Sequence, residues 1–144
     1  VTGQLSYVRE NIKGGDVTGI ATNASNRLNQ IKLKGSYVYR AKYGASLSHF
    51  STTGSADPTL YPGLQDDGSG TGTMIPVSIT GNAANNPSTR GWIPELFWNP
   101  TQYMRVGMQY FIYDRFNGAA TNYDGAGRNA KDNNTLFLYV WAAY

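Results

Sequence analysis

The sequence of 144 residues contains no cysteine. This absence excludes disulfides, thiolate metal sites, iron–sulfur ligands and covalent haem attachment. Any redox centre would therefore have to belong to a partner. Histidine is almost as scarce: His49 is the only one, and a single histidine without cysteine makes a transition-metal site improbable.

Long hydrophobic runs are also missing. A membrane-spanning helix needs about 20 consecutive apolar residues, and no segment of the chain approaches that length. Hydrophobic residues make up only 40% of the sequence, which excludes a helical membrane protein. A β-barrel is compatible with this composition, because its apolar residues stand at alternate positions and not in runs.

Charge and catalytic motifs exclude two further classes. The net charge is +3, and the lysines and arginines do not form the stripe that nucleic-acid binding requires. Ser46, Ser48 and Ser51 lie near His49, but strand spacing sends neighbours to opposite faces and no acid is placed to orient the histidine. We expect no enzyme, no cofactor and no nucleic-acid partner.

The sequence is rich in glycine and tyrosine, with 17 and 11 residues, which suits many turns and interfacial aromatic rings. Alternation of apolar and polar residues predicts strands and turns throughout. The expected strands are residues 1–9, 30–40, 43–51, 89–98, 102–115 and 135–144. A short extra strand is expected at 74–80, and a bulge or local fray at Pro94, whose missing N–H disturbs a ladder.

The expected connections alternate between long and short. Long loops span residues 10–29, 52–88 and 117–133, whereas short turns lie at residues 41–42 and 99–101. Bacterial barrels have long extracellular loops and short periplasmic turns. The sequence thus predicts one all-β domain over residues 1–144, an antiparallel up-and-down meander of about six strands. This meander is of the barrel type, either part of a larger barrel or closed or extended by partner copies.

The last two strands carry the clearest apolar face. Its residues are expected to meet lipid or a partner subunit: Met104, Val106, Met108, Leu136, Leu138 and Val140. The opposite face of the last strand carries Phe137, Tyr139 and Trp141, which suits a barrel interior packed against something. Trp92, Trp98, Trp141 and the tyrosines are interpreted as an interfacial girdle, with a sugar-binding platform as the alternative.

Five charged residues are expected to point into the interior: Lys32, Lys34, Arg90, Glu95 and Arg105. One interpretation is a pore with a weak preference for anions, or a cradle for an acidic partner. The other is that the charges satisfy one another, as barrel interiors commonly require.

The loop over residues 123–133 combines oxygen ligands with flexible glycines. Asp124, Asn129 and Asp132 are candidate Ca²⁺ ligands on that pattern. The loop lacks the bidentate acid that ends an EF-hand loop, and the same residue types also make ordinary turns. We therefore predict no metal, with this loop as the candidate if one binds.

Three stretches resemble a known class of proteins: LKGSYVYRAKYGASLSHFSTTG at 33–54, STRGWIPELFW at 88–98, and 104–144, which includes YDGAGRNAKDNNT. They are similar to the C-terminal portion of porin-like Gram-negative outer-membrane β-barrels, of the type found beside multihaem cytochromes. The resemblance covers most of the chain outside residues 55–87. It implies an outer-membrane channel or scaffold, a cytochrome as candidate partner, and Tyr144 as part of the assembly signal.

Six strands are fewer than the roughly eight of the smallest single-chain barrels. Either upstream strands or partner copies are therefore expected to complete the sheet. An alternative function is a self-assembling extracellular filament or tube, because free sheet edges invite addition of another copy. A third interpretation is a soluble lectin-like β-sandwich. The expected location is the bacterial outer membrane or the cell surface.

Overall fold

The computed structural model describes residues 1–13, 22–66, 69–71, 74–76 and 81–143. Within these ranges the chain is almost entirely strand and loop. The long strands are β1 (Thr2–Lys13), β2 (Ser25–Tyr39), β3 (Tyr43–Gly54), β6 (Thr89–Thr101), β7 (Met104–Arg115) and β8 (Thr135–Ala142). Two short strands, β4 (Leu64–Asp66) and β5 (Met74–Pro76), and a 3₁₀ turn, η1 (Ala130–Asn133), complete the elements.

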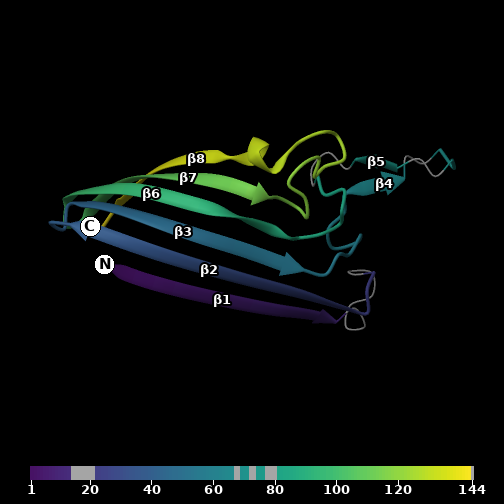
Figure 1. Cartoon of the computed structure of the whole chain (residues 1–144), viewed down its shortest axis with the longest axis horizontal. Helices are drawn as coiled ribbons and strands as arrows, with labels where there is room; N and C mark the ends of the chain where they lie inside the picture. Colours follow the sequence, from purple (N-terminus) through teal and green to yellow (C-terminus); the bar gives the residue numbers. More distant parts are fainter. Residues whose placement is uncertain (14–21, 67–68, 72–73, 77–80, 144) are drawn as a thin grey trace.

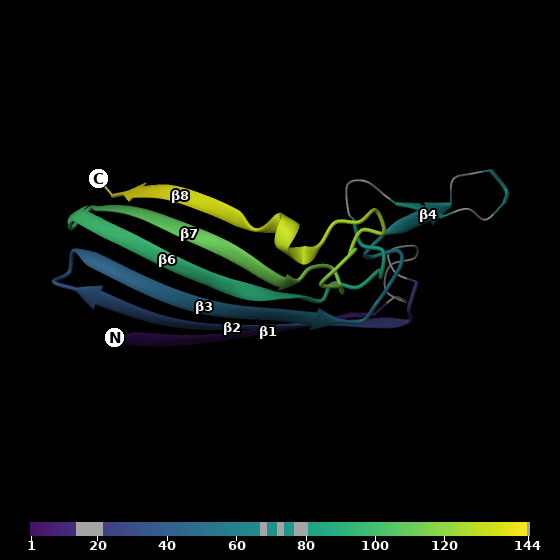
Figure 2. The same cartoon turned by 45° about the horizontal axis from the view of Figure 1, so that its top comes forward.

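The six long strands form one antiparallel sheet in the order β1-β2-β3-β6-β7-β8. This confirms the expected all-β meander. Figures 1 and 2 show a single curved layer, with the short turns at the end where the chain begins and the long loops at the other end. The sheet is open, because β1 and β8 stand at opposite edges. The only other described sheet is the β4-β5 ribbon, so the β-sandwich interpretation is wrong.

The strands reach further than the sequence predicted. β1 and β2 stay paired out to Lys13 and Ser25, well into the expected loop. The hydrogen bonds between strands join backbone groups and do not need apolar side chains. A strand with polar ends is therefore longer than the alternation of apolar and polar residues predicts. The turn between β6 and β7 lies at residues 102–103, whereas it was expected at residues 99–101. Of the expected extra strand, Met74–Pro76 pairs with β4, and residues 77–80 lie outside the described part.

The register shift in β6 is not at Pro94. Trp92 pairs with Ile112 and Glu95 with Gln109, so the register is the same on both sides of the proline. The shifts occur between Arg90 and Gly91 and again near Thr101. At Gly91 any Cβ would overlap the carbonyl oxygen of Ile112. Glycine therefore permits the close backbone approach at this bulge. At Pro94 the ladder to β7 lapses without a shift, because neither Ile93 nor Pro94 has a partner on β7, which is the local fray that the sequence predicted.

The two faces of the sheet differ sharply. We call the face that carries Glu95 the inner face and the opposite one the outer face. Inner-face side chains are the most buried of the sheet, and include Ser46, Ser48, Ile93, Glu95 and Phe97. Within the described residues only Ile93, Phe97, Tyr123 and Ala130 are buried hydrophobic side chains. Most apolar residues of the sheet therefore remain on its surface.

A row of alternating glycines and aromatic rings crosses the inner face. Gly44 on β3 pairs with Phe97 on β6, which pairs with Gly107 on β7, which pairs with Tyr139 on β8. A Cβ at Gly44 would overlap the Phe97 ring, and one at Gly107 would overlap the Tyr139 ring. Each ring therefore lies over the glycine of the neighbouring strand, an arrangement that fixes register.

Replacing Gly107 with alanine is expected to destabilise the fold by about 1–3 kcal/mol, the usual cost of overpacking. The new methyl group would push the Tyr139 ring out of its place. Gly35→Ala is the matched control, because nothing lies within 4 Å of a Cβ there. Urea unfolding of the two variants in detergent micelles measures the difference, and equal effects would show that the ring contact is unimportant.

Candidate functional site

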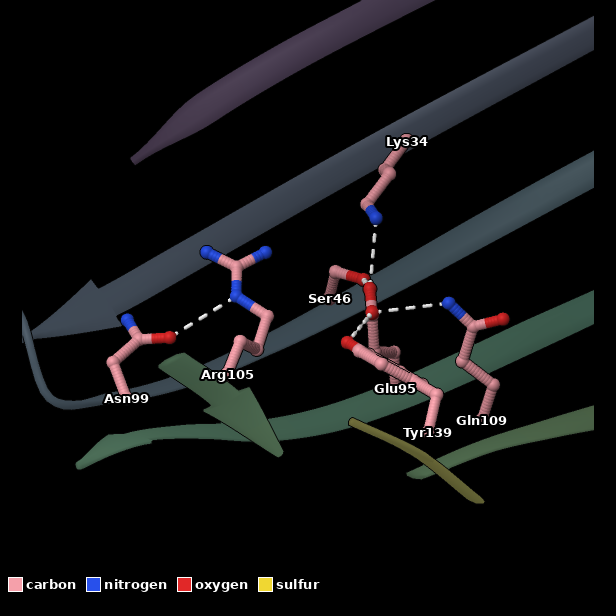
Figure 3. A network of polar contacts seen from close by, with 7 residues as sticks. All are labelled: Lys34, Ser46, Glu95, Asn99, Arg105, Gln109 and Tyr139. Carbon is pink, nitrogen blue, oxygen red and sulfur yellow. Dashed lines mark hydrogen bonds and ion pairs between the residues drawn. The ribbon is translucent and has the colours of Figure 1, made fainter. Parts of the chain in front are cut away.

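The inner face holds a cluster of polar side chains around Glu95, which is 5% exposed. Lys34 Nζ lies 2.7 Å from Oε2, and Ser46 Oγ donates to the same oxygen at 2.6 Å. Tyr139 Oη and Gln109 Nε2 donate to Oε1 at 2.6 and 3.0 Å. Figure 3 shows these donors converging on the carboxylate from different strands. We call these five residues the Glu95 cluster.

Strand register brings the cluster together. Ser46 on β3 and Gln109 on β7 are the direct ladder partners of Glu95 on β6. Lys34 on β2 and Tyr139 on β8 lie one position further along the sheet, on either side of Glu95. Lys34 is paired with Ser48, and Tyr139 is paired with Gly107. Small residues at those two positions leave room for the longer side chains. Five neighbouring strands are therefore joined through a single carboxylate.

The cluster satisfies its own carboxylate. An ionised carboxylate has about four lone-pair sites, and four donors occupy them here. Burying such a charge is unfavourable unless it is paired and hydrogen-bonded, and Lys34 supplies the counter-charge. All of these acceptor positions of Glu95 are therefore occupied by side chains of the sheet, and the arrangement is suited to holding strands in place.

Arg105 lies beside the cluster. Its Nε donates to Asn99 Oδ1 at 3.0 Å, and its guanidinium carbon is 4.2 Å from the centre of the Phe97 ring. An inner-face groove of about 1190 Å³ runs along this region. The groove is lined by polar and charged side chains as well as by aromatic rings. They include Glu95, Arg105, Gln109, Phe111, Phe137 and Tyr139.

The structure places four of the five predicted interior charges on the inner face. Lys34, Glu95 and Arg105 lie together, whereas Lys32 is exposed one row further along, opposite Phe50. The prediction for Arg90 is wrong. Arg90 pairs with Ser51 and alternates with Gly91, which puts it on the outer face with Trp92. The sequence already indicated this, because Arg90 and Trp92 are two residues apart and residues so spaced on a strand share a face.

Sequence reasoning missed the uncharged members of the site, Ser46, Gln109, Tyr139 and Asn99. A search for charged residues passes over them, because none carries a charge at neutral pH. Their strand parity was readable from the sequence. What the sequence did not supply was the register that sets Ser46 and Gln109 directly beside Glu95.

A second buried carboxylate, Asp57, joins two of the long loops. Its side chain is completely buried and accepts hydrogen bonds from the backbone N–H of Thr22, Asn23 and Leu60 and from Asn26 Nδ2. Burial alone would raise the pKa of Asp57, but these donors hold that pKa well below its ordinary value. Asp57 is therefore a structural clamp. Its sequence signal is the Asp-Pro step, which favours turn initiation.

The candidate Ca²⁺ ligands are used in turns. Asp124 Oδ1 accepts from the backbone N–H of Ala126 and Arg128, and Asp132 Oδ2 from that of Asn129. Asn129 Oδ1 accepts from the Asn122 N–H at 3.3 Å. In the part of the chain that the structure describes, no group of three or more acidic or histidine side chains is placed to hold a metal. These contacts account for the pattern as ordinary turn chemistry.

Comparison of the chain with protein-family models, with curated proteins and with solved structures gives no match. No helix among the described residues is long and apolar enough to cross a membrane. Tyr144, the predicted assembly residue, lies outside the described residues. The class that the fold defines is an open antiparallel meander with an apolar outer face and an inner face that mixes polar, charged and aromatic side chains.

Proposed function

We propose that this chain is the C-terminal part of a porin-like outer-membrane β-barrel that serves as a channel or scaffold. The observation that carries the proposal is the apolar outer face. Large hydrophobic side chains are exposed on it in every long strand, from Leu5 at 69% to Leu138 at 74%. The full set predicted for the last two strands lies on this face: Met104, Val106, Met108, Leu136, Leu138 and Val140. Water-soluble monomers rarely expose so large a contiguous apolar surface.

Aromatic residues border this surface, as in a membrane barrel. Tyr39, Tyr43 and Trp98 form one cross-strand row near the short turns. Tyr7 and Trp92 lie toward the loop end of the same face. Tyrosine and tryptophan favour the two membrane interfaces. Trp141 is not part of this border, because it pairs with Arg105 on the inner face.

The inner face supports the same proposal. Lys34 and Glu95 form an ion pair on it, and Arg105 is held by the Asn99 side chain. These contacts favour a scaffolded interior over a ring of free cations. The unpaired edges of β1 and β8 need further strands for closure, supplied by a longer chain or by copies of this one. A cytochrome in the interior is the partner that the resemblance implies.

Single cysteines test the proposal cleanly, because the chain has none of its own. Val140→Cys and Trp141→Cys place one on each face at neighbouring positions, and both wild-type side chains are exposed, at 64% and 56%. In phosphatidylcholine vesicles, a fluorophore at 140 should be quenched by lipid-borne spin labels and one at 141 should not. The proposal would be refuted if the chain were monomeric in buffer without detergent and the fluorophores at positions 140 and 141 were quenched equally.

The open edges favour a second candidate, a self-assembling extracellular filament. Exposed ladder groups on β1 and β8 are templates for strand addition by another copy. The apolar outer faces would then pack against one another. Electron microscopy of unheated protein without detergent separates the two candidates, since ordered filaments are expected only from the second.

A further inference from the structure

The outer face carries a cationic groove beyond its apolar band, at the loop end of β1 and β2. Three of the residues that line the groove are positively charged: Arg9, Lys13 and Arg27. Polar neighbours such as Asn11, Asn29 and Ser55 complete its lining, and its volume is about 770 Å³. No acidic side chain lines it among the described residues. We call this feature the basic groove.

Strand register places the basic groove on the outer face. Arg9 follows Tyr7 by two residues on β1, and Arg27 lies opposite Asn11 on β2. Alternation therefore puts the cations on the face that carries Tyr7 and Ile31. Arg9, Lys13 and Arg27 are all exposed. The groove thus borders directly on the surface that we propose to be covered by lipid.

The three cations are spaced to act together. Arg9 and Lys13 are four residues apart on β1, roughly 13 Å. Arg27 lies opposite Asn11 on the adjacent strand, between the two, and is roughly 7–8 Å from each as a diagonal neighbour. Arg9 Nε donates to Asn11 Oδ1 at 3.4 Å, which steadies its side chain. The ion pair that the described residues form joins Lys34 and Glu95 on the inner face. No described carboxylate therefore neutralises the basic groove through an ion pair.

We infer that the basic groove binds the phosphate groups of an anionic lipid headgroup at the membrane boundary. Arginine binds phosphate through paired N–H donors, and cations beside an anionic lipid surface attract it strongly. The ligand is a lipid and not a free ion, because acyl chains can lie on the apolar face next to the bound headgroup. The spread of the cations suits a headgroup with more than one phosphate. This inference rests on the proposed membrane function.

The test uses the whole chain folded in phosphatidylcholine nanodiscs, with diphosphoryl lipid A added as the probe. The variant Arg9→Gln, Lys13→Gln, Arg27→Gln should bind the probe at least about tenfold more weakly than the wild type. Its control is Lys32→Gln, Lys42→Gln, Lys131→Gln, which removes the same charge at exposed sites elsewhere. The control should bind within about twofold of the wild type, and lipid A without phosphates should bind to neither with measurable affinity.

Three outcomes would overturn the inference. Equal binding by the groove variant and the wild type would show that the groove is not the site. Equal loss in the control would show that only net charge matters. Inorganic phosphate that competes at the same concentration as lipid A would show a free-phosphate site. Insertion into plain phosphatidylcholine reports on the membrane proposal separately, because that lipid has no net charge.

Discussion

Leu138→Arg is expected to destabilise the chain in a phosphatidylcholine bilayer by about 2–4 kcal/mol, the cost of an arginine on the lipid face of a barrel near the midplane. Leu138 is 74% exposed on the outer face and pairs with Met108 in the middle of the apolar band. In water such a substitution at an exposed position changes stability by only about 0.5 kcal/mol. Urea unfolding in vesicles, followed by tryptophan fluorescence, measures the difference.

The neighbouring residue gives the control for this prediction. Phe137 is 50% exposed on the inner face and forms an edge contact with Phe111 at 5.1 Å between ring centres. Phe137→Arg should lose only that contact, about 0.5–1.5 kcal/mol, because the arginine would remain on the inner face beside Gln109, in the groove that also holds Glu95. A Leu138→Arg variant as stable as the wild type, or equal costs at 137 and 138, would contradict a lipid-facing outer surface.

Glu95→Ala is expected to lower the free energy of unfolding by about 2–3 kcal/mol. Breaking a fully buried ion pair by removing one partner costs about 3–5 kcal/mol. Lys34 is 30% exposed and regains some hydration, which reduces that cost. The donors of Ser46 and Tyr139 would also lose their acceptor. Equilibrium unfolding in detergent micelles provides the measurement.

Two comparisons make the Glu95 prediction specific. Glu10→Ala removes an exposed acid from the same sheet and should change stability by less than about 0.5 kcal/mol. Combining Glu95→Ala with Lys34→Met should restore part of the loss, because no unpaired buried charge then remains. If the double variant shows the simple sum of the two single effects, the pair is not coupled and the cluster is not a unit.

The alternation of apolar residues was enough to predict the meander and the composition of its faces. The face of Leu138 and Val140 follows from a period of two, because successive side chains point to opposite sides of a strand. The polar extensions of β1 and β2 escaped prediction, since Asn11 and Arg27 offer no apolar pattern although their backbones pair. Arg90 was misplaced although its parity with Trp92 was available, and Asp57 was overlooked among many turn residues.

The amino-acid pattern alone was sufficient to predict an antiparallel meander with short turns at one end, long loops at the other and one apolar face. These properties depend on local periodicity and on turn chemistry, which neighbouring residues carry. Which side chains meet across strands became visible only in the folded sheet. The convergence of Lys34, Ser46 and Tyr139 on Glu95 and the position of Arg27 beside Arg9 and Lys13 depend on register, and register is a property of paired strands.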